Sequence, residues 1–323
     1  MRRLRLGWFE LTAAVLLVVT AVDGVYTGHG WHNSDFVLYT ATGKIMLSGA
    51  WAHTFHNPEV QAAPLELMLA RALHWIAGSS YVALAVLTET ILCAALIATF
   101  RSFVGRRTLP LIVFVAEAIA LGPVPDAYAT GHYAEPVAGM LWLLAARRAR
   151  AGKVVTAGLL IGASAGFELW GVLGITVLAL APSFRRAIGG AVIAGAVPGL
   201  MLLPFVLGRD FHMFQFHWYV AGGPIHLIVG SGYPFGWPLR LLQAGATVGI
   251  VGGLARLIRR NPAAIFVIPA ATTFVRLIFD PLGMFYYWDP VLEVALMGAA
   301  AAFVQRERIV GWAESAAARF APA

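Results

Sequence analysis

The sequence predicts an all-α, polytopic membrane protein with about ten transmembrane crossings. Of its 323 residues, 59% are hydrophobic and 12% are charged, whereas about 25% are charged in an average soluble domain. Apolar runs long enough to span a bilayer recur along the chain. The basic residues gather in short loops between these runs, which is the positive-inside pattern. This pattern accounts for the pI of about 9.9 without nucleic acid as a partner.

We expect the spans at 7–27, 80–100, 108–122, 133–148, a hairpin of two short helices over 154–182, then 187–207, 240–258, 262–279 and 288–304. Together they form a single integral-membrane domain over residues 1–323, with no soluble domain. Because no small-residue cleavage site follows the first span, we expect it to be retained rather than removed as a signal peptide. No internal repeat, nucleotide-binding motif or strand pattern stands out.

The hairpin decides the topology. With it, 18 basic residues lie on one face, and five lie on the other, namely Lys44, Arg71, Arg209, Arg240 and Arg276. A single long span over 154–182 would carry Arg185 and Arg186 to the second face and reverse the charge bias after them. We therefore expect a hairpin with Glu168 at its outer tip, in a protein of the cytoplasmic membrane whose two termini are both cytoplasmic.

Four segments are expected at the outer face. The first, 28–79, is long and contains two helices that lie at the interface, with Trp51 and Trp75 as headgroup anchors. The others are 123–136, 208–239 and 279–290. All nine histidines of the chain fall on these outer segments. This sidedness predicts that the polar chemistry of the protein lies at the outer end of the bundle.

Acids near the outer ends of the spans are the first candidates for catalysis. Asp35 follows the first span, and it either caps a helix or acts as a general base, a role typically worth about 10²–10⁴-fold in rate. Asp126 and His132 come just before the span at 133–148, and Glu135 lies at its start. Glu135 precedes Pro136 and so stands at a helix start, where an acid also stabilises the helix dipole without any function.

Candidate binding residues follow along the chain. Glu168 stands in apolar surroundings, where an acid is costly and often functional. Arg276 lies four residues before Asp280, so it either pairs with that acid or binds a lipid phosphate with its guanidinium fork. Arg240 either does the same or anchors a span end. The neighbouring Tyr286 and Tyr287 suit an interfacial belt, or stacking against a sugar ring or a prenyl chain.

Two His-x-x-His pairs, His29/His32 and His53/His56, suggest a divalent metal such as zinc or manganese, with Asp35 as a third ligand. The spacing is weak on its own, since each pair lies in irregular sequence. No cofactor is certain from the sequence, and a divalent metal is the candidate it offers. Single outer histidines such as His212 are expected to be solvated or to hydrogen-bond a sugar.

Three segments carry a resemblance to a known family. In Ser34–Gly49 an acid is followed by a helix that ends near a glycine. The second consists of Gly131–Pro136 together with the glycine-rich Ala157–Trp170, and the third, Arg276–Trp288, contains an arginine, then Asp-Pro, then Tyr-Tyr. The layout resembles the GT-C superfamily of integral-membrane glycosyltransferases. Within it, the chain is most similar to the actinobacterial mannosyltransferases that use polyprenyl-phosphate mannose.

The resemblance implies transfer of a sugar, mannose or another hexose or pentose, from a polyprenyl-phosphate donor to a glycan or glycolipid acceptor at the outer face. It implies that Asp35 is the base and that Arg276, with Arg240, neutralises the departing phosphate. Asp126, His132 and Glu135 would then orient the acceptor or hold a metal.

Two departures from the family pattern matter. The family usually carries a lysine near the place of Glu168, so no phosphate-binding role passes to that residue. The chain is also shorter than typical members and lacks their C-terminal soluble domain. Two other functions stay open, namely a transporter or flippase of a lipid-linked substrate, and a non-catalytic partner in cell-envelope assembly.

Overall fold

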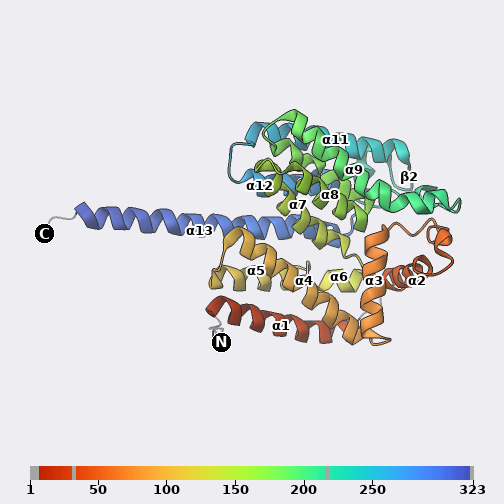
Figure 1. Ribbon diagram of the computed structural model, residues 1–323, viewed down its shortest axis with the longest axis horizontal. Helices are drawn as coiled ribbons and strands as arrows, with labels where there is room; N and C mark the ends of the chain where they lie inside the picture. Colours follow the sequence, from red (N-terminus) through yellow and green to blue (C-terminus); the bar gives the residue numbers. More distant parts are fainter. Residues whose placement is uncertain (1–6, 31–33, 216–217, 321–323) are drawn as a thin grey trace.

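The computed structural model describes residues 7–30, 34–215 and 218–320, and helices dominate this part of the chain (Figure 1). Within these described ranges, six helical segments of 22 to 24 residues are long and apolar enough to cross a membrane: Trp8–His29, Tyr81–Val104, Thr108–Thr130, Phe184–Leu207, Trp237–Ile258 and Phe285–Arg306. Each coincides with a predicted span. They indicate a helical membrane protein, as the composition predicts.

The other four predicted crossings fall on shorter elements. These are α7 (Ala134–Arg150), α8 (Val154–Phe167), the 3₁₀ helix η2 (Leu169–Leu180) and α12 (Ala264–Ile278). None reaches the roughly 20 residues that a bilayer-spanning helix usually needs. The full count of ten crossings therefore stays a prediction.

The helices form two groups on either side of α13 (Asp289–Phe320), as Figure 1 shows. One group holds α1 (Trp8–Gly30), α4 (Tyr81–Val104), α5 (Thr108–Ala120) and α6 (Pro125–Thr130). Its core is built from large side chains such as Leu96, Phe100 and Phe114. The other group holds α7 to α12, including α9 (Phe184–Leu207) and α11 (Trp237–Ile258). Its core is rich in alanine, and small residues let helices approach closely.

The chain reverses at Glu168, as the charge pattern predicts. A Cβ at Gly190, early in α9, would lie 2.9 Å from the side chain of Leu178 and 3.1 Å from the carbonyl oxygen of Val154. The end of η2 and the start of α8 are therefore neighbours. A Cβ at Gly171 would lie 2.4 Å from the backbone of Ser164. Only glycine lets the two arms of the hairpin touch there.

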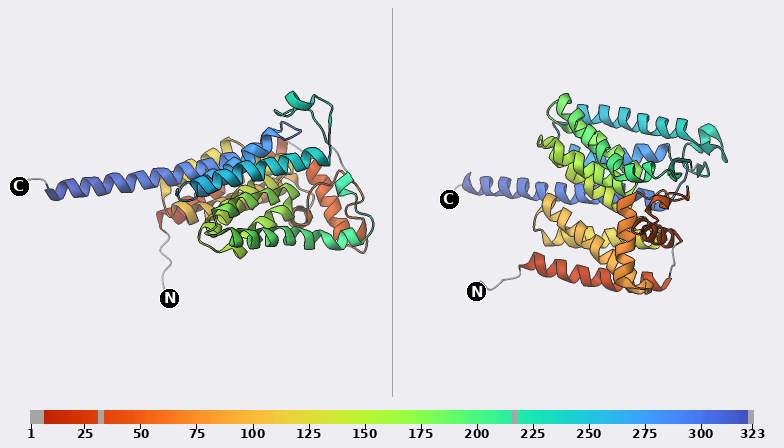
Figure 2. Two further views of the ribbon diagram at one scale, coloured as in Figure 1. Left: turned by 90° about the horizontal axis from the view of Figure 1, so that it is seen from above. Right: turned by 45° about the vertical axis from the view of Figure 1, so that its right-hand side comes forward.

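The segment after α1 gathers at one end of the bundle. It contains α2 (Ser34–Met46), the single 3₁₀ turn η1 (Trp51–His53) and α3 (Pro64–Ala77). Figure 2 shows that α3 runs across this end rather than along the bundle. The two helices expected between 28 and 79 are thus present, and Trp75 is 79% exposed. We call this region the α2–α3 end.

The segment 208–239 differs from the prediction, which contains no strand. It forms η3 (Met213–Gln215), the short helix α10 (His226–Val229) and an antiparallel ribbon of β1 (Trp218–Tyr219) and β2 (Pro234–Phe235). Two-residue strands are too short for an alternating pattern to be visible in the sequence. The ribbon also lies against the loop before η4 (Phe285–Trp288), because Ala221 N–H donates to the carbonyl of Pro281 at 3.0 Å.

The opposite end of the bundle carries the basic loops. Arg106 pairs with Glu10 at 3.0 Å, and Arg150 donates to the carbonyl of Asn261 at 2.8 Å. The start of α1 and the end of α13 lie toward this end in Figure 1. That arrangement agrees with two termini on one side, and the cytoplasmic assignment stays a prediction. Arg2, Arg3 and Arg5, and the side chains of Arg308 and Arg319, lie outside the described residues.

We predict that positions 153 and 185, exposed beside the two ends of the hairpin, react with a membrane-impermeant thiol reagent from the same face. The variants Lys153→Cys and Arg185→Cys would each be made in a Cys93→Ala background, since Cys93 is the one cysteine of the chain. Labelling from opposite faces would show that 154–182 crosses once, and it would contradict the hairpin topology.

Candidate functional site

Polar side chains from five parts of the fold meet at the α2–α3 end. They come from α2, α3, the start of α7, the hairpin tip and α12, and we call them the central cluster: Asp35, Glu66, His132, Glu135, Glu168 and Arg276. One side-chain ligand atom from each of His132, Glu135 and Glu168 lies within 4.8 Å of the other two. The cluster therefore contains five of the residues that the sequence predicted for the site. Four are the candidates Asp35, His132, Glu135 and Glu168, and the fifth is the phosphate-binding candidate Arg276.

Asp35 and His132 form the exposed edge of this cluster. His132 Nε2 lies 3.1 Å from Asp35 Oδ2, with the Asp35 side chain 44% exposed and that of His132 only 11% exposed. Gly131 makes the contact possible. Its φ is +77°, and a Cβ there would lie 2.7 Å from the backbone nitrogen of Phe36. A left-handed glycine thus brings the start of α7 against the first turn of α2.

Aromatic rings fix the plane of His132. The ring of Tyr286 stacks on it with centroids 4.7 Å apart and an interplanar angle of 18°. Tyr39 of α2 meets it edge to face at 6.0 Å. The Tyr286 hydroxyl also lies 3.4 Å from Nε2. The imidazole is therefore held from two sides, and its orientation toward Asp35 is preset.

Glu66 belongs to the site although sequence reasoning did not select it. It is fully buried, and its Oε1 accepts a hydrogen bond from the N–H of Tyr133 at 3.0 Å. A side chain of α3 thus caps the N-terminus of α7, where helix N–H groups have no partner of their own. Burial, with the charge of Glu168, raises the pKa of Glu66 well above its ordinary value.

A signal for Glu66 was present in the sequence. Glu66, Ala70 and Leu73 follow the i, i+4, i+7 spacing of one helix face, and all three are buried. A carboxyl group on the apolar face of an amphipathic helix needs a polar partner inside the protein. That spacing would have marked Glu66 as a site residue.

Two further acids that the prediction named, the fully buried Glu135 and the partly buried Glu168, belong to the cluster. Glu135 lies in the first turn of α7, as expected, but it is fully buried, and neither of its carboxylate oxygens has a hydrogen-bond partner among the described residues. Glu168 lies at the hairpin tip, where its backbone forms an isolated bridge with Ala62. Buried acids without partners are costly, and such groups are candidates for function.

Arg276 is the buried cation of the cluster. Its guanidinium lies over two rings, with Cζ 4.0 Å from the centroid of Trp170 and 4.8 Å from that of Tyr287. Its Nη2 pairs with Asp280 Oδ2 at 3.3 Å, so the expected i, i+4 pair is present. Nη1 has no hydrogen-bond partner within the described chain. Burial raises the pKa of Asp280, and the Arg276 charge counteracts that rise.

Two predicted site residues lie elsewhere. Asp126 occupies the first turn of α6 and turns back on its own loop, where a Cβ at Gly122 would collide with its carboxylate. Arg240, in the first turn of α11, has its guanidinium 5.7 Å from the ring of Trp237. Gln243, three residues later in α11, donates to the Arg276 carbonyl at 3.1 Å, so α11 contacts the Arg276 region there.

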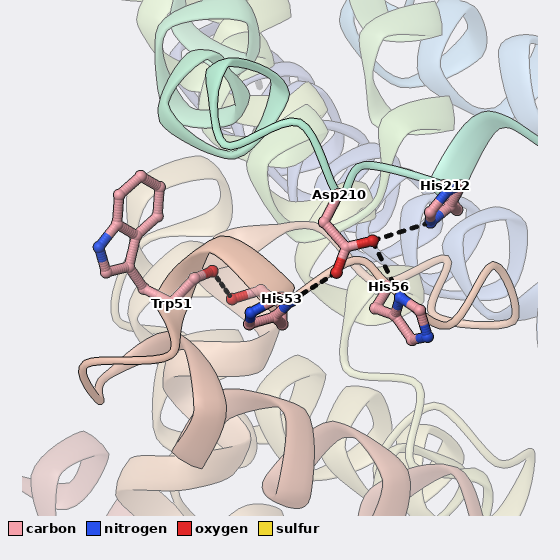
Figure 3. A network of polar contacts seen from close by, with 6 residues as sticks. Trp51, His53, His56, Asp210 and His212 are labelled. Carbon is pink, nitrogen blue, oxygen red and sulfur yellow. Dashed lines mark hydrogen bonds and ion pairs between the residues drawn. The ribbon is translucent and has the colours of Figure 1, made fainter.

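The predicted metal ligands His53 and His56 come together around Asp210, whereas Asp35, named as a third ligand, pairs with His132. The metal itself stays a prediction. His212, expected to be a single outer histidine, joins His53 and His56 (Figure 3). Hydrogen bonds from His56 and His53 lower the pKa of Asp210. The other predicted pair is not testable as a pair, since His32 lies outside the described residues.

A cavity of about 360 Å³ lies between α2, α3 and the start of α4. Its walls include Lys44, Arg71 and His74, with Ser79 and Ser80 at the turn before α4. No member of the central cluster lines it. Its basic side chains make it a second place where an anionic group could bind.

Comparison of the chain with models of protein families, with curated proteins and with solved structures gives no match. The resemblance to GT-C glycosyltransferases therefore depends on the three segments quoted above. Function has to be argued from the geometry of the site.

We predict that Glu66→Gln stabilises the protein increasingly as the pH rises. The pKa of Glu66 is raised above its ordinary value of 4.5, so the folded state holds a proton that the unfolded state releases, and wild-type stability falls as the pH rises above that value. Glutamine keeps the oxygen that caps α7 and does not titrate. Thermal unfolding in detergent would be compared at acidic and mildly alkaline pH.

The control is Glu59→Gln, because Glu59 is exposed. Its unfolding temperature should follow that of the wild type at every pH. If Glu66→Gln did the same, Glu66 would be ionised in the folded protein at the same pH as in the unfolded chain.

Proposed function

We propose that the protein is a glycosyltransferase that moves a sugar from a polyprenyl-phosphate donor to a hydroxyl acceptor at the outer face of the cytoplasmic membrane. One observation carries the proposal. A half-exposed acid, Asp35, is paired with a ring-clamped imidazole, His132, in the same cluster as a buried arginine, Arg276, that has one uncommitted side of its guanidinium. A base and a phosphate-binding cation are the two groups that such a transfer requires.

Asp35 is the proposed general base. Its carboxylate would take the proton of the acceptor hydroxyl while that oxygen attacks the anomeric carbon of the sugar and the bond to the lipid phosphate breaks. Displacement of this kind inverts the configuration at that carbon. The 3.1 Å contact with His132 holds the carboxylate at the edge of the cluster, where it is still 44% exposed to an incoming acceptor.

Arg276 is the proposed phosphate ligand. The departing phosphate gains negative charge in the transition state, and stabilisation of developing charge by preorganised donors is often the largest single contribution to catalysis. The rings of Trp170 and Tyr287 both contact the guanidinium, so it is oriented before the reaction begins. Nη1 is the side that remains for the phosphate, because Nη2 binds Asp280.

A second candidate function is transport of a lipid-linked substrate. Glu89 in α4 and Glu293 in α13 are fully buried within candidate spans. Ionisable groups at such depth are typical of transporters. We prefer the enzyme because the proposed base Asp35, the ring of His132 and the cation Arg276 come together at the α2–α3 end. They are not distributed along the spans.

We predict that Asp35→Asn lowers kcat for sugar transfer by about 10²–10⁴-fold, since that is the usual contribution of a general base. The assay would use purified protein in detergent with radiolabelled polyprenyl-phosphate sugars and glycan acceptors. Detergent micelles have no two compartments, so transport alone yields no product. Absence of transfer by the wild type from every donor would support the transporter or the non-catalytic partner. Unchanged transfer by Asp35→Asn would remove Asp35 as the base.

We predict that Arg276→Lys lowers transfer at least tenfold, because a lysine ammonium cannot stack against two rings and bind Asp280 and a phosphate at once. The matched control is Arg71→Gln, which removes a cation from the separate basic cavity. It should leave transfer near the wild-type rate. The reverse result, with Arg71→Gln inactive and Arg276→Lys active, would place the donor phosphate in that cavity.

A further inference from the structure

A second polar cluster lies on the surface at the α2–α3 end, apart from the proposed chemistry. It consists of His53 and His56, from the loop between α2 and α3, and Asp210 and His212, from the loop after α9 (Figure 3). Three imidazole rings thus surround one carboxylate. We call these four residues the His53–His212 cluster.

The two loops are held in register by the backbone. His212 N–H donates to the carbonyl of Phe55 at 2.8 Å, and the fully buried ring of Phe55 packs against Phe205 and Phe211. Arg209, the residue before Asp210, has a φ of 66°. A left-handed conformation is costly for a residue with a side chain, so the surrounding contacts hold this turn in a defined shape.

The distances match those of a metal site. Zinc binds imidazole nitrogen and carboxylate oxygen at about 2.0–2.2 Å, so ligand atoms of a tetrahedral site lie roughly 3.3 Å apart. Asp210 Oδ1 lies 2.9 Å from His56 Nδ1 and 3.4 Å from His212 Nδ1. One side-chain ligand atom from each of these three residues lies within 4.8 Å of the other two. Little movement is needed to bind an ion between them.

His53 serves the site differently. Its Nδ1 lies 2.5 Å from Asp210 Oδ2, the oxygen that the other two rings do not approach. An N–H donated to the second oxygen of a ligating carboxylate is a usual supporting contact in metal sites. His53 thus orients Asp210 while Oδ1 faces the rings of His56 and His212.

The residue types also suit a metal. A neutral imidazole offers a ring-nitrogen lone pair to a transition metal. The ligand set of two imidazoles and one carboxylate, without cysteine, suits zinc.

We propose that His56, Asp210 and His212 bind one Zn²⁺ ion, with His53 positioning the carboxylate and water completing the coordination. The ion joins the loop between α2 and α3 to the loop after α9. These loops lie 154 residues apart in sequence, so the ion cross-links two distant parts of the chain at the α2–α3 end. The proposal does not depend on the sugar-transfer function.

The first test uses the wild-type protein. Chelator-treated protein in detergent would be titrated with ZnCl₂, and histidine accessibility to diethylpyrocarbonate would be mapped by mass spectrometry. We expect zinc to protect His56 and His212, while His74 outside the cluster reacts equally with and without zinc. Equal modification of His56 and His212 in both conditions would overturn the proposal.

The second test uses variants and total bound zinc. His212→Gln should lose the ion from this site, and His53→Gln should weaken binding by about 10- to 100-fold, as supporting residues do. The matched controls are His74→Gln and, for the central cluster, His132→Gln, both of which should keep this ion. If His132→Gln removed the zinc and His212→Gln did not, the ion would belong to the central cluster and the proposal would be wrong.

Co²⁺ provides a readout that is independent of folding yield. A tetrahedral Co²⁺ site with nitrogen and oxygen ligands absorbs visible light far more strongly than the octahedral aqueous ion. The wild type and His74→Gln should show these bands, and His212→Gln should not. Bands of equal strength in all three proteins, or in none of them, would contradict the assignment.

Discussion

The first turn of α3 is the constraint on which the arrangement at the α2–α3 end depends. Ala63 N–H donates to the carbonyl of Phe167 at 2.7 Å, which ties this turn to the hairpin tip. In the same turn, Glu66 accepts a hydrogen bond from the N–H of Tyr133 and so caps the N-terminus of α7. A single turn thereby sets the position of Glu168 relative to His132. Without it, the acids would belong to separate helices with no fixed spacing.

The charge balance of the central cluster shapes what it can bind. Four carboxyl groups accompany one guanidinium, and Asp280 already shares that guanidinium. An anionic phosphate would be repelled by this set if every acid were ionised. The raised pKa of Glu66 favours its neutral form, and the N-terminus of α7 contributes the positive end of a helix dipole. Phosphate binding at Arg276, as proposed above, would therefore be coupled to protonation inside the cluster.

Local patterns predicted most of the scaffold, and long-range pairing explains what they missed. The lengths of the apolar runs predicted the six long helices, and the distribution of basic residues in the loops predicted the chain reversal at Glu168. Neither pattern carries information about which side chains meet across the fold. Asp210 reaches His53 from 157 residues away, and Glu66 reaches Tyr133 from 67 residues away. Asp35 was predicted because it is an acid at the outer end of a span. Its partner His132 could not be predicted, because the two meet only where Gly131 lets the chain pass close to the backbone of α2.

The short arms of the hairpin have a consequence for the lipids around the protein. At about 1.5 Å per residue, the 14 residues of α8 span about 21 Å. At about 2.0 Å per residue, the 12 residues of η2 span about 24 Å. A bilayer core is about 30 Å thick. In the proposed topology, lipids next to the hairpin are compressed or the tip is recessed below the headgroups. A local thinning of this kind would bring the headgroup of a long-chain carrier down toward Glu168 and Arg276, and membrane thickness itself would then tune access to the site.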